Sequence, residues 1–193
     1  MAYSTDHVAA ASPLATGGIF AAPSGTALPT TATSALNVAF VPLGRVGEDG
    51  LTPSGEAASI ADLRDWSGEV VASVTENKSI TRFDFTLLGI FDPEVAKFVF
   101  GTANVTVTAA GVSAGTKLAI QDKGDDITAR ELVFDMLYEG KRMRIVVPNG
   151  KVTVTAELPF ARTALSGYTC QVTCLADDSG VRTYRYYQND DPI

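Results

Sequence analysis

From Leu36 onward, apolar and polar side chains alternate with a period of two through most of the chain. The clearest stretch is KVTVTAEL at residues 151–158, where polar Lys151, Thr153, Thr155 and Glu157 alternate with Val152, Val154, Ala156 and Leu158. Because successive side chains of a strand point to opposite faces, this alternation predicts a half-buried strand. Further strands are predicted at 81–88, 104–109, 116–121, 131–138, 141–147, 168–175 and 181–187. We therefore expect a mainly β chain, folded as a β-sandwich or barrel.

Two dipeptides predict hairpin turns between these strands. Glu139-Gly140 separates the strand at 131–138 from the one at 141–147, and its length suits a tight turn. Asn149-Gly150 precedes the strand at 151–158, and both residue types tolerate the positive φ of a type I′ turn. The three strands are therefore expected to form an antiparallel meander.

One segment, FDPEVAKFVFG at residues 91–101, predicts a short helix over about 92–100. Asp92 is suited to cap its first turn, Pro93 fits the first helical position, and Gly101 can end it. The helical period places Val95, Phe98 and Val99 on one apolar face. We expect this helix to pack against the sheets.

A run without Asp, Glu, Lys or Arg extends from His7 to Gly44, in a chain with a net charge of −7. Its Pro and Gly residues disfavour both a helix and a central strand, and it cannot form a core alone. So long an uncharged segment is poorly suited to lying free in water. We expect it to lie along another surface as an added strand, and we divide the chain into an N-terminal arm (1–35) and a β domain (36–193).

Acidic residues concentrate just after this run. Residues 47–76 contain seven acidic residues and one basic residue, Arg64. The middle of this region is rich in turn-forming residues, which predicts a long loop or extended hairpin at about 47–66. A loop of this length in a compact domain indicates that it binds a partner or has another function.

Size and charge exclude several classes of protein. The 193 residues, 46% of them hydrophobic, can bury one substantial core. A pI near 4.6 disfavours binding to nucleic acid or anionic lipid, which requires clustered Lys or Arg. No apolar run approaches the ~20 residues that span a bilayer, and the N-terminus lacks the pattern of a secretory signal. We expect the chain to fold in a cytoplasm.

The two cysteines, Cys170 and Cys174, belong to one predicted strand. Four residues along a strand place them on the same face but roughly 13 Å apart, which is too far for a disulfide. We expect both to be reduced, buried hydrophobic residues.

Catalytic signals are sparse. The single histidine, His7, lies in the expected arm, where it cannot be held rigidly against a nucleophile. The sequence has no Walker loop, Rossmann glycine fingerprint or zinc-type Cys/His cluster. Asp122, Asp125 and Asp126 lack the full ligand series of a calcium loop, so we expect a solvated turn there. We expect no catalytic residue, cofactor or metal.

Two consecutive segments carry a specific combination of motifs: GGIFAAPSGTALPTTATSALNVAFVPLGRVGEDGLTPS and DLRDWSGEVVASVTENKSITRFDFTLLGIFDPEVAKFVFG. They resemble the tail tube (major tail) proteins of long-tailed bacteriophages, especially those infecting actinobacteria. In that family a small-residue arm ending in AP.GT.LP precedes an LG.V.EDG strand and turn. A long loop closing on Trp then leads to a V....TE strand, a strand of alternating aromatics, and a short helix ending in FG. The resemblance covers roughly residues 17–101. One departure is Leu88-Gly89, where a carboxylate for an inter-subunit ion pair is expected.

The resemblance implies a structural virion protein of β-sandwich or split-barrel type with one flanking helix. Such proteins assemble as hexameric rings that stack into a hollow tube, with four strands of each subunit lining a channel for double-stranded DNA. The implied partners are copies of the chain itself and other tail proteins (tape measure, tail terminator and distal tail), with no membrane. The implied location is the virion tail, assembled in the cytoplasm of the bacterial host.

The resemblance also implies which residues meet between subunits. The arm and the long loop are expected to bridge neighbouring rings through Phe20, Pro23, Leu28, Pro29, Glu48, Asp49, Leu51, Ile60, Leu63 and Trp66. A bore that passes a polyanion is expected to carry more carboxylates than bases, because clustered bases would bind phosphates. The candidates facing the lumen are Glu69, Asp84, Glu131, Asp135 and Glu157.

Three alternatives remain open. The first is another virion protein on a related β scaffold, such as a tail terminator or head decoration protein. The second is a carbohydrate-binding β-sandwich that uses Trp66 and the tyrosines. The third is the tube of a contractile tail or a type VI secretion device, which shares the architecture.

Overall fold

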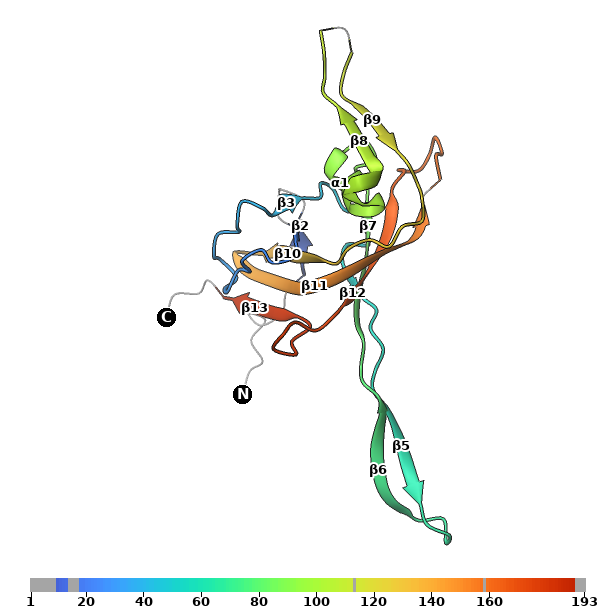
Figure 1. The fold of residues 1–193 in the computed structure, drawn as a ribbon. Coiled ribbons are helices and arrows are strands. Elements are labelled where there is room, and N and C mark those ends of the chain that lie inside the picture. Colours follow the sequence, from blue (N-terminus) through green and yellow to red (C-terminus); the bar gives the residue numbers. More distant parts are fainter. Residues whose placement is uncertain (1–9, 14–17, 113, 158, 190–193) are drawn as a thin grey trace.

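The structure, a computed structural model, describes residues 10–13, 18–112, 114–157 and 159–189. Two residues named above, His7 and Leu158, lie outside this part. The body is one curved sheet with the strand order β3-β2-β10-β11-β12-β7-β4, in which β1 also pairs with β10 and β13 with β11 (Figure 1). Its strands are β1 (Ser12–Pro13), β2 (Ile19–Pro23), β3 (Val41–Pro42), β4 (Thr52–Pro53), β7 (Thr81–Leu87), β10 (Arg130–Tyr138), β11 (Lys141–Glu157), β12 (Tyr168–Cys174) and β13 (Tyr184–Gln188). The predicted mainly β fold with one short helix is confirmed.

The turn between β10 and β11 is formed by the predicted dipeptide. Glu139 and Gly140 both have positive φ, 46° and 85°, and they connect the paired residues Tyr138 and Lys141. This two-residue connection is typical of a type I′ hairpin, whose twist matches that of its strands.

The predicted hairpin at Asn149-Gly150 is wrong, because β11 continues through it. The first part of β11 pairs with β13, and the part from Gly150 onward pairs with β12. A Cβ added to Gly150 would lie 2.4 Å from Leu132 Cδ1 and 3.0 Å from Val172 Cγ1. The glycine is therefore required by close packing between strands rather than by a turn.

Helix α1 (Pro93–Phe100) covers one face of the sheet. The Asp92 side chain accepts a hydrogen bond from Glu94 N at 2.9 Å, and Pro93 stands in the first turn. The buried residues of the helix pack into the main core with aromatic and aliphatic side chains of the sheet, including Phe83, Phe85, Leu132, Phe134, Val147 and Val172. The predicted helix, its cap and its apolar face are confirmed.

Replacing Asp92 by alanine is expected to lower the free energy of unfolding by about 1 kcal/mol, because an amide of the first turn loses its acceptor. Asp92→Asn keeps a capping oxygen and is the matched control, expected to lie close to the wild type. Urea denaturation of both variants measures the difference. Equal losses for the two variants would contradict the capping role.

A second core lies on the other face of the sheet. Ala22, Phe40, Val133 and Val146 form it, and they are joined by Phe20, Leu28, Leu36, Ala39, Tyr184 and Tyr186. Residues 24–40, which we call the covering segment, therefore cover this face, and Tyr184 and Tyr186 of the neighbouring strand β13 pack against the same core. Strand pairing begins before the alternating pattern that starts at Leu36, because β2 pairs with β10 along Ile19–Pro23. The small side chains of β2 fit this crowded position, and Ala21 and Ala22 are buried.

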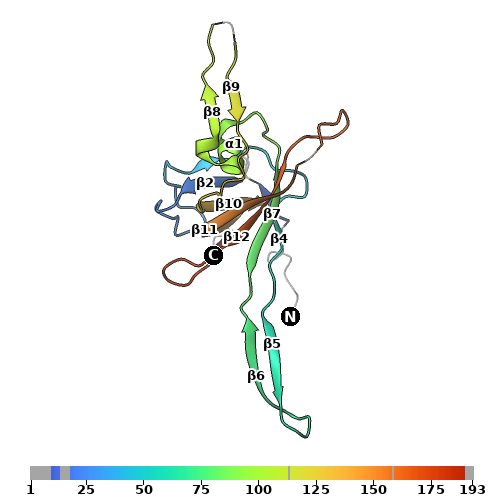
Figure 2. The same ribbon diagram turned by 45° about the vertical axis from the view of Figure 1, so that its right-hand side comes forward.

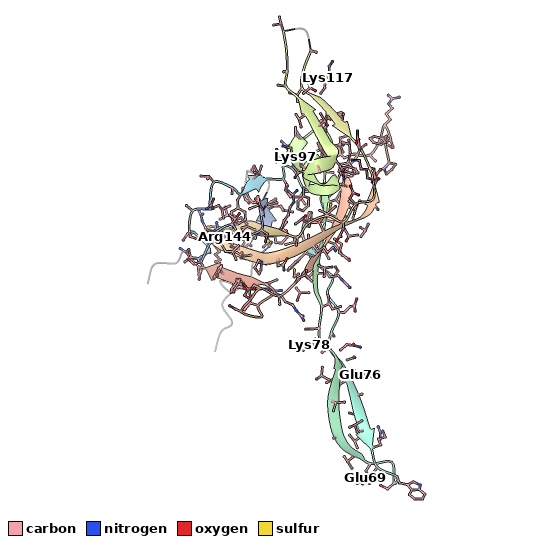
Figure 3. The ribbon with its side chains drawn as sticks, in the orientation of Figure 1. Glu69, Glu76, Lys78, Lys97, Lys117 and Arg144 are labelled. Atoms are coloured by element: carbon pink, nitrogen blue, oxygen red, sulfur yellow. The ribbon has the colours of Figure 1, made fainter. Side chains whose placement is uncertain are left out.

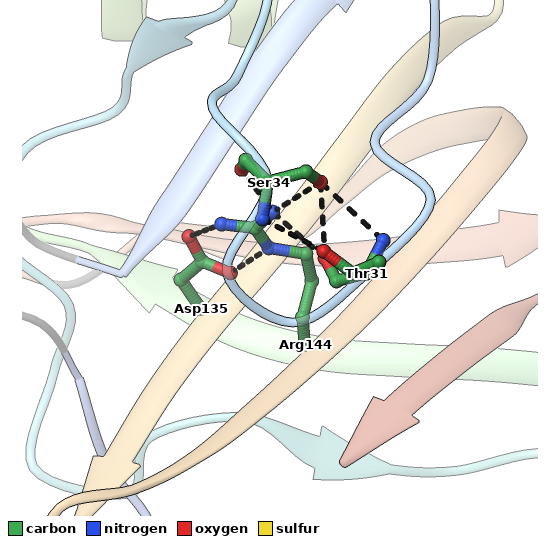
Figure 4. Close-up of polar contacts among 4 residues, drawn as sticks. All are labelled: Thr31, Ser34, Asp135 and Arg144. Carbon is green, nitrogen blue, oxygen red and sulfur yellow. Dashed lines mark hydrogen bonds and ion pairs between the residues drawn. The ribbon is translucent and has the colours of Figure 1, made fainter. Parts of the chain in front are cut away.

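A buried ion pair fixes the covering segment to the sheet (Figure 4). Arg144 of β11 and Asp135 of β10 are directly opposite each other, and their side chains are 5% and 7% exposed. Arg144 Nε and Nη2 donate to the two carboxylate oxygens of Asp135 at 2.5 and 2.8 Å. Arg144 Nη1 donates to the backbone oxygens of Thr31 at 3.0 Å and Ser34 at 2.7 Å. One guanidinium thus joins two strands and the segment that covers them.

Both cysteines are free and buried on β12. Burial raises the pKa of the Cys170 thiol and of the Cys174 thiol to about 12. The prediction of reduced, buried cysteines is confirmed.

Two hairpins project from the body in opposite directions (Figures 1 and 2). The first hairpin is formed by β5 (Ser59–Arg64) and β6 (Val70–Asn77). The second is formed by β8 (Val105–Thr108) and β9 (Lys117–Ile120). The short 3-10 helix η2 (Thr102–Asn104) directly precedes β8. Each forms its own two-stranded sheet.

Candidate assembly surfaces

The β5–β6 hairpin is highly exposed. All eight residues of β6 are exposed, and Figure 3 shows Glu69 at the far end of the hairpin and Glu76 nearer the body. A lone two-stranded hairpin is marginally stable in water. We therefore expect a hairpin of this length to be stabilised by contact with another chain. The loop predicted at about 47–66 is therefore an extended hairpin whose second strand lies beyond the predicted range.

One face of this hairpin is apolar. Ala61 lies opposite Val74 and Leu63 opposite Ala72, and directly opposite residues share a face. Leu63 and Val74 are 49% and 46% exposed. We call these four residues the apolar hairpin face.

The opposite face of the hairpin is more polar. Asp62 lies opposite Ser73, whose hydroxyl donates to Asp62 Oδ1 at 2.7 Å. Ile60 and Thr75 are partners on this face. The predicted contact residues Ile60 and Leu63 are thus both exposed, but on different faces of the hairpin.

The hairpin turn holds Trp66 fully in solvent. Gly68 N donates to Asp65 O at 3.1 Å, and Gly68 has a φ of 89°. Asp65 Oδ1 accepts from Ser67 Oγ at 2.5 Å and from Glu69 N at 3.1 Å, and these bonds, that of Ser67 foremost, lower the pKa of the Asp65 carboxyl. The turn is ordered by its own hydrogen bonds, so presenting the indole to a partner costs little further ordering.

A cavity of about 240 Å³, which we call the turn cavity, lies between the body and the turn at residues 47–50. Gly50 N donates to Gly47 O at 3.0 Å, and Gly47 N donates to Thr86 O at 2.8 Å, so the turn is held against β7. The apolar side chains that line the cavity come from both parts: Ile19, Val46, Leu51, Phe134 and Met136. The exposed carboxylates Glu48 and Asp49 line it as well. The structure therefore brings three of the predicted contact residues to one cavity.

The predicted contact residues of the arm lie against the protomer's own sheet. Phe20 and Leu28 are half-buried in the second core, Pro29 is buried, and Pro23 is exposed at the end of β2. The described part of the arm thus lies along a surface as an added strand, and that surface is in the same chain. The domain boundary at residue 35 stays a prediction.

The residues proposed to face the lumen divide into two groups. Glu131 and Asp135 are 5% exposed each, so their side chains are engaged within the protomer. Glu69 and Glu157 are exposed, and Asp84 is half-buried, accepting from Gln171 Nε2 at 2.9 Å. Only this second group is available to an open surface of the protomer.

Asp84 belongs to a polar face, shared by three strands, that was not predicted from the sequence. Register places Asp84 beside Gln171 and Gln171 beside Thr153, on the side of β7, β12 and β11 opposite the main core. The two bases of this face are each paired with a carboxylate, Arg82 with Glu56 and Lys151 with Asp126 at 2.8 Å. Alternation alone indicates polar faces in the single strands, but only the strand order places them side by side.

Glu131 carries a buried oxygen without a hydrogen bond. Its Oε1 accepts from Gly25 N at 2.8 Å, while its Oε2 is buried and unsatisfied within the described part of the chain. Burial raises the pKa of this carboxyl, against the opposing effect of the backbone hydrogen bonds from Gly25 and Thr26. The folded chain therefore binds this proton more tightly than the unfolded chain does.

We expect Glu131→Gln to remove a pH dependence of stability. A folded-state pKa above the unfolded value means that the folded chain binds the proton more tightly, so the contribution of Glu131 is present at low pH and is lost as pH rises through the folded pKa. Glutamine keeps an acceptor for Gly25 N and cannot ionise. The test is to compare the free energy of unfolding of the two proteins between about pH 4 and 8, a range chosen to include the usual pKa of Glu near 4.3. Parallel curves would contradict this assignment.

Other features of the described residues add no reactive centre. No group of three or more His, Cys, Asp or Glu side chains in this part could hold a metal ion. Asp125 instead accepts from Asn104 Nδ2 at 3.2 Å, and Asp126 pairs with Lys151. Among the described helices, none is long and apolar enough to cross a membrane.

The family model described as phage tail tube protein matches residues 1–193, which is the whole chain. No curated protein matches the chain.

Proposed function

The chain belongs to the phage tail tube protein family, and from this membership we propose that it forms hexameric rings that stack into a tube for double-stranded DNA. The coarser statement follows from the family itself: the chain is a structural component of a viral tail, which assembles with itself and with other tail components. The ring size, the passage of DNA and the identity of the partners (tape measure, tail terminator and distal tail) are our proposal.

The observation that carries the proposal is the β5–β6 hairpin. Its apolar face and Trp66 are exposed in the single protomer, and the hairpin extends away from the body. An exposed apolar surface on an ordered projection is typical of a protein interface. A projection that binds a different surface on the next copy makes a head-to-tail contact, which generates rings or open polymers rather than closed pairs.

We propose that the polar face of β7, β12 and the second half of β11 lines the bore. Threonine and glutamine side chains on it can hydrogen-bond to water, and its bases Arg82 and Lys151 are paired with carboxylates. A wall of this kind releases few counterions from DNA phosphates, so it binds the duplex weakly. Asp84 is the acidic candidate on this face. Glu157 lies opposite Tyr168, on the side of the main core, and Glu69 lies at the far end of the hairpin, so these two are candidates only for the entrances of the bore.

Electron microscopy of the purified full-length protein at rising concentration tests the proposal. We expect long hollow tubes with six-fold rings, and a reconstruction with the polar face inward and no net positive bore. Discrete rings or trimers that never stack would support a tail terminator or head decoration protein instead. A monomer with glycan binding that is lost in Trp66→Ala would support a carbohydrate-binding domain. A net positive bore would overturn the assignment of the lining.

A further inference from the structure

We propose that strand β6 of one protomer adds to the open edge of β13 in a second protomer, antiparallel to it, with Glu76 beside Arg185 and Val74 beside Tyr187. This inference rests on the proposed function, and it names the surface that receives the projecting hairpin. The mode is strand addition, in which an extended segment continues an exposed sheet edge and pairs with its backbone.

The outer edge of β13 is open. Within the described part of the chain, β13 pairs with β11 alone, so alternate backbone amides and carbonyls point away from the sheet. The short edge strands β3 and β4 have two residues each, and each contains a proline, Pro42 or Pro53, which is typical of a protected edge. In contrast, β13 has five residues and no proline. This edge is therefore suited to receive another strand.

Two rows of side chains cross β10, β11 and β13 and end at this edge. Both rows lie on the side of the main core, and they consist of Phe134, Ile145 and Arg185 and of Met136, Met143 and Tyr187. Arg185 is exposed, and Tyr187 is 65% exposed. Each row thus ends in a side chain that an added strand would cover.

Strand β6 offers the matching side chains at the same spacing. Val74 and Glu76 are both exposed, and residues two positions apart in a strand share a face. In an antiparallel pair, placing Glu76 opposite Arg185 also places Val74 opposite Tyr187, whereas a parallel pair would place Lys78 there. Opposite charges and aromatic–β-branched pairs are both favourable across strands. The apolar hairpin face then continues the row that ends in Tyr187.

The two surfaces have opposite charges. The hairpin at residues 59–78 has four acidic and two basic residues, a net charge of −2, and residues 69–77 contain two acids and no base. Residues 179–189, which include β13, contain two bases and no acid. The carboxylate just before them, Asp177, already accepts from Tyr184 Oη at 2.7 Å and from two backbone amides. Charge therefore favours β6 as the strand that binds there.

The added strand comes from a second copy. Among the described residues β6 pairs only with β5, and both views show the hairpin extending away from the sheet (Figures 1 and 2). Addition to β13 also provides the third strand that an isolated hairpin lacks. Because the edges of β6 and β13 are different surfaces, filling every β13 edge links the copies head to tail.

Cysteine cross-linking in the full-length protein tests the register. Val74→Cys with Tyr187→Cys places the two thiols opposite each other across the proposed strand pair, within reach of a disulfide. Under mild oxidation we expect a ladder of disulfide-linked chains on a non-reducing gel. The native thiols of Cys170 and Cys174 are buried with pKa values of about 12, so they do not contribute.

The matched control moves one thiol to the other face of β6. Thr75 is the neighbour of Val74 and lies on the opposite side of the hairpin, so Thr75→Cys with Tyr187→Cys is expected to give single chains. Tubes that form normally without a ladder, or a ladder of equal strength in the control, would overturn the inference and leave the proposed function standing. If the wild-type chain forms no assembly at all, the proposed function fails and this inference fails with it.

Charge exchange gives a second, independent readout. Arg185→Glu is expected to raise the concentration needed for assembly by about tenfold, because it sets two carboxylates opposite each other. Adding Glu76→Arg to the same chain is expected to restore most of the loss. Assembly unaffected by Arg185→Glu, or no recovery in the double variant, would contradict the contact between Glu76 and Arg185.

Arg142→Glu is the control for this exchange. Arg142 is exposed and lies opposite Gln188 of β13, on the face turned away from the main core. The substitution makes the same change of charge at the same end of the sheet, and we expect the concentration needed for assembly to stay near that of the wild type. A loss as large as that of Arg185→Glu would assign the effect to charge alone and overturn the proposed pairing.

Discussion

Replacing Asp135 by alanine is expected to lower the free energy of unfolding by about 3–5 kcal/mol, because the variant leaves a buried arginine without its carboxylate. Arg144 is 4% exposed, so the guanidinium loses its carboxylate at a site with little access to bulk water. The same arginine holds the covering segment through the backbone oxygens of Thr31 and Ser34. We therefore expect residues 24–40 of the variant to exchange their amide hydrogens faster than in the wild type. Urea denaturation and hydrogen exchange measure the two effects.

Asp126→Ala is the control for this prediction. It also removes a carboxylate from an ion pair, with Lys151, but the Asp126 side chain is 81% exposed, so the expected loss is about 0–1 kcal/mol. A second comparison replaces both charges, with Asp135→Leu and Arg144→Met, and is expected to recover much of the stability because no unpaired charge remains. Similar losses in the free energy of unfolding for Asp135→Ala and Asp126→Ala would show that the buried ion pair contributes no more to stability than the exposed one.

Local patterns predicted most of the strands. The alternation in 81–88 matches β7, where Phe83, Phe85 and Leu87 are buried, and the cap, proline and glycine of α1 stand where the sequence places them. These features were predictable because each depends on residues a few positions apart. The Asn149-Gly150 turn was not, because the role of Gly150 depends on Leu132 and Val172, which are distant in the sequence.

The outward face of β10 shows a second limit of local patterns. Alternation places Glu131 and Asp135 opposite the main core, which is true, but it does not reveal that the covering segment buries that face. Val133, an apolar residue between them, was the available sign of a second core. The turn at Glu139-Gly140 also fixes Asp135 opposite Arg144, so the ion pair could have been predicted from register.

The candidate assembly surfaces were predictable in outline. The acidic, turn-rich region indicated an extended hairpin, and Leu63 and Trp66 are exposed on it. The apolar face was missed because half of it, Ala72 and Val74, lies after the turn. Its sign in the sequence is the DWSG turn with apolar residues on both sides. The turn cavity was not predictable as a shape, because it joins residues of β2, β10 and the 46–51 segment.

Replacing Val74 by aspartate is expected to abolish assembly while leaving the protomer folded. Val74 lies on the apolar hairpin face, opposite Ala61, and contact with another copy would bury the introduced carboxylate among apolar side chains without a partner. In the free protomer the same residue is in water, so the melting temperature is expected to stay near that of the wild type. We expect the concentration required for tube formation to rise at least about tenfold, measured by sedimentation and electron microscopy.

Thr75→Asp separates the effect of the face from that of the charge. Thr75 follows Val74 directly but lies on the opposite side of the hairpin, as the partner of Ile60. The substitution Thr75→Asp therefore adds the same charge to the same strand, on its other face. If Leu63 and Val74 meet another chain and the Thr75 side does not, only Val74→Asp prevents tubes from forming. Loss of assembly in both variants would mean that both sides of the hairpin are covered, or that added negative charge alone is sufficient. Normal assembly of Val74→Asp would remove the apolar hairpin face from the interface.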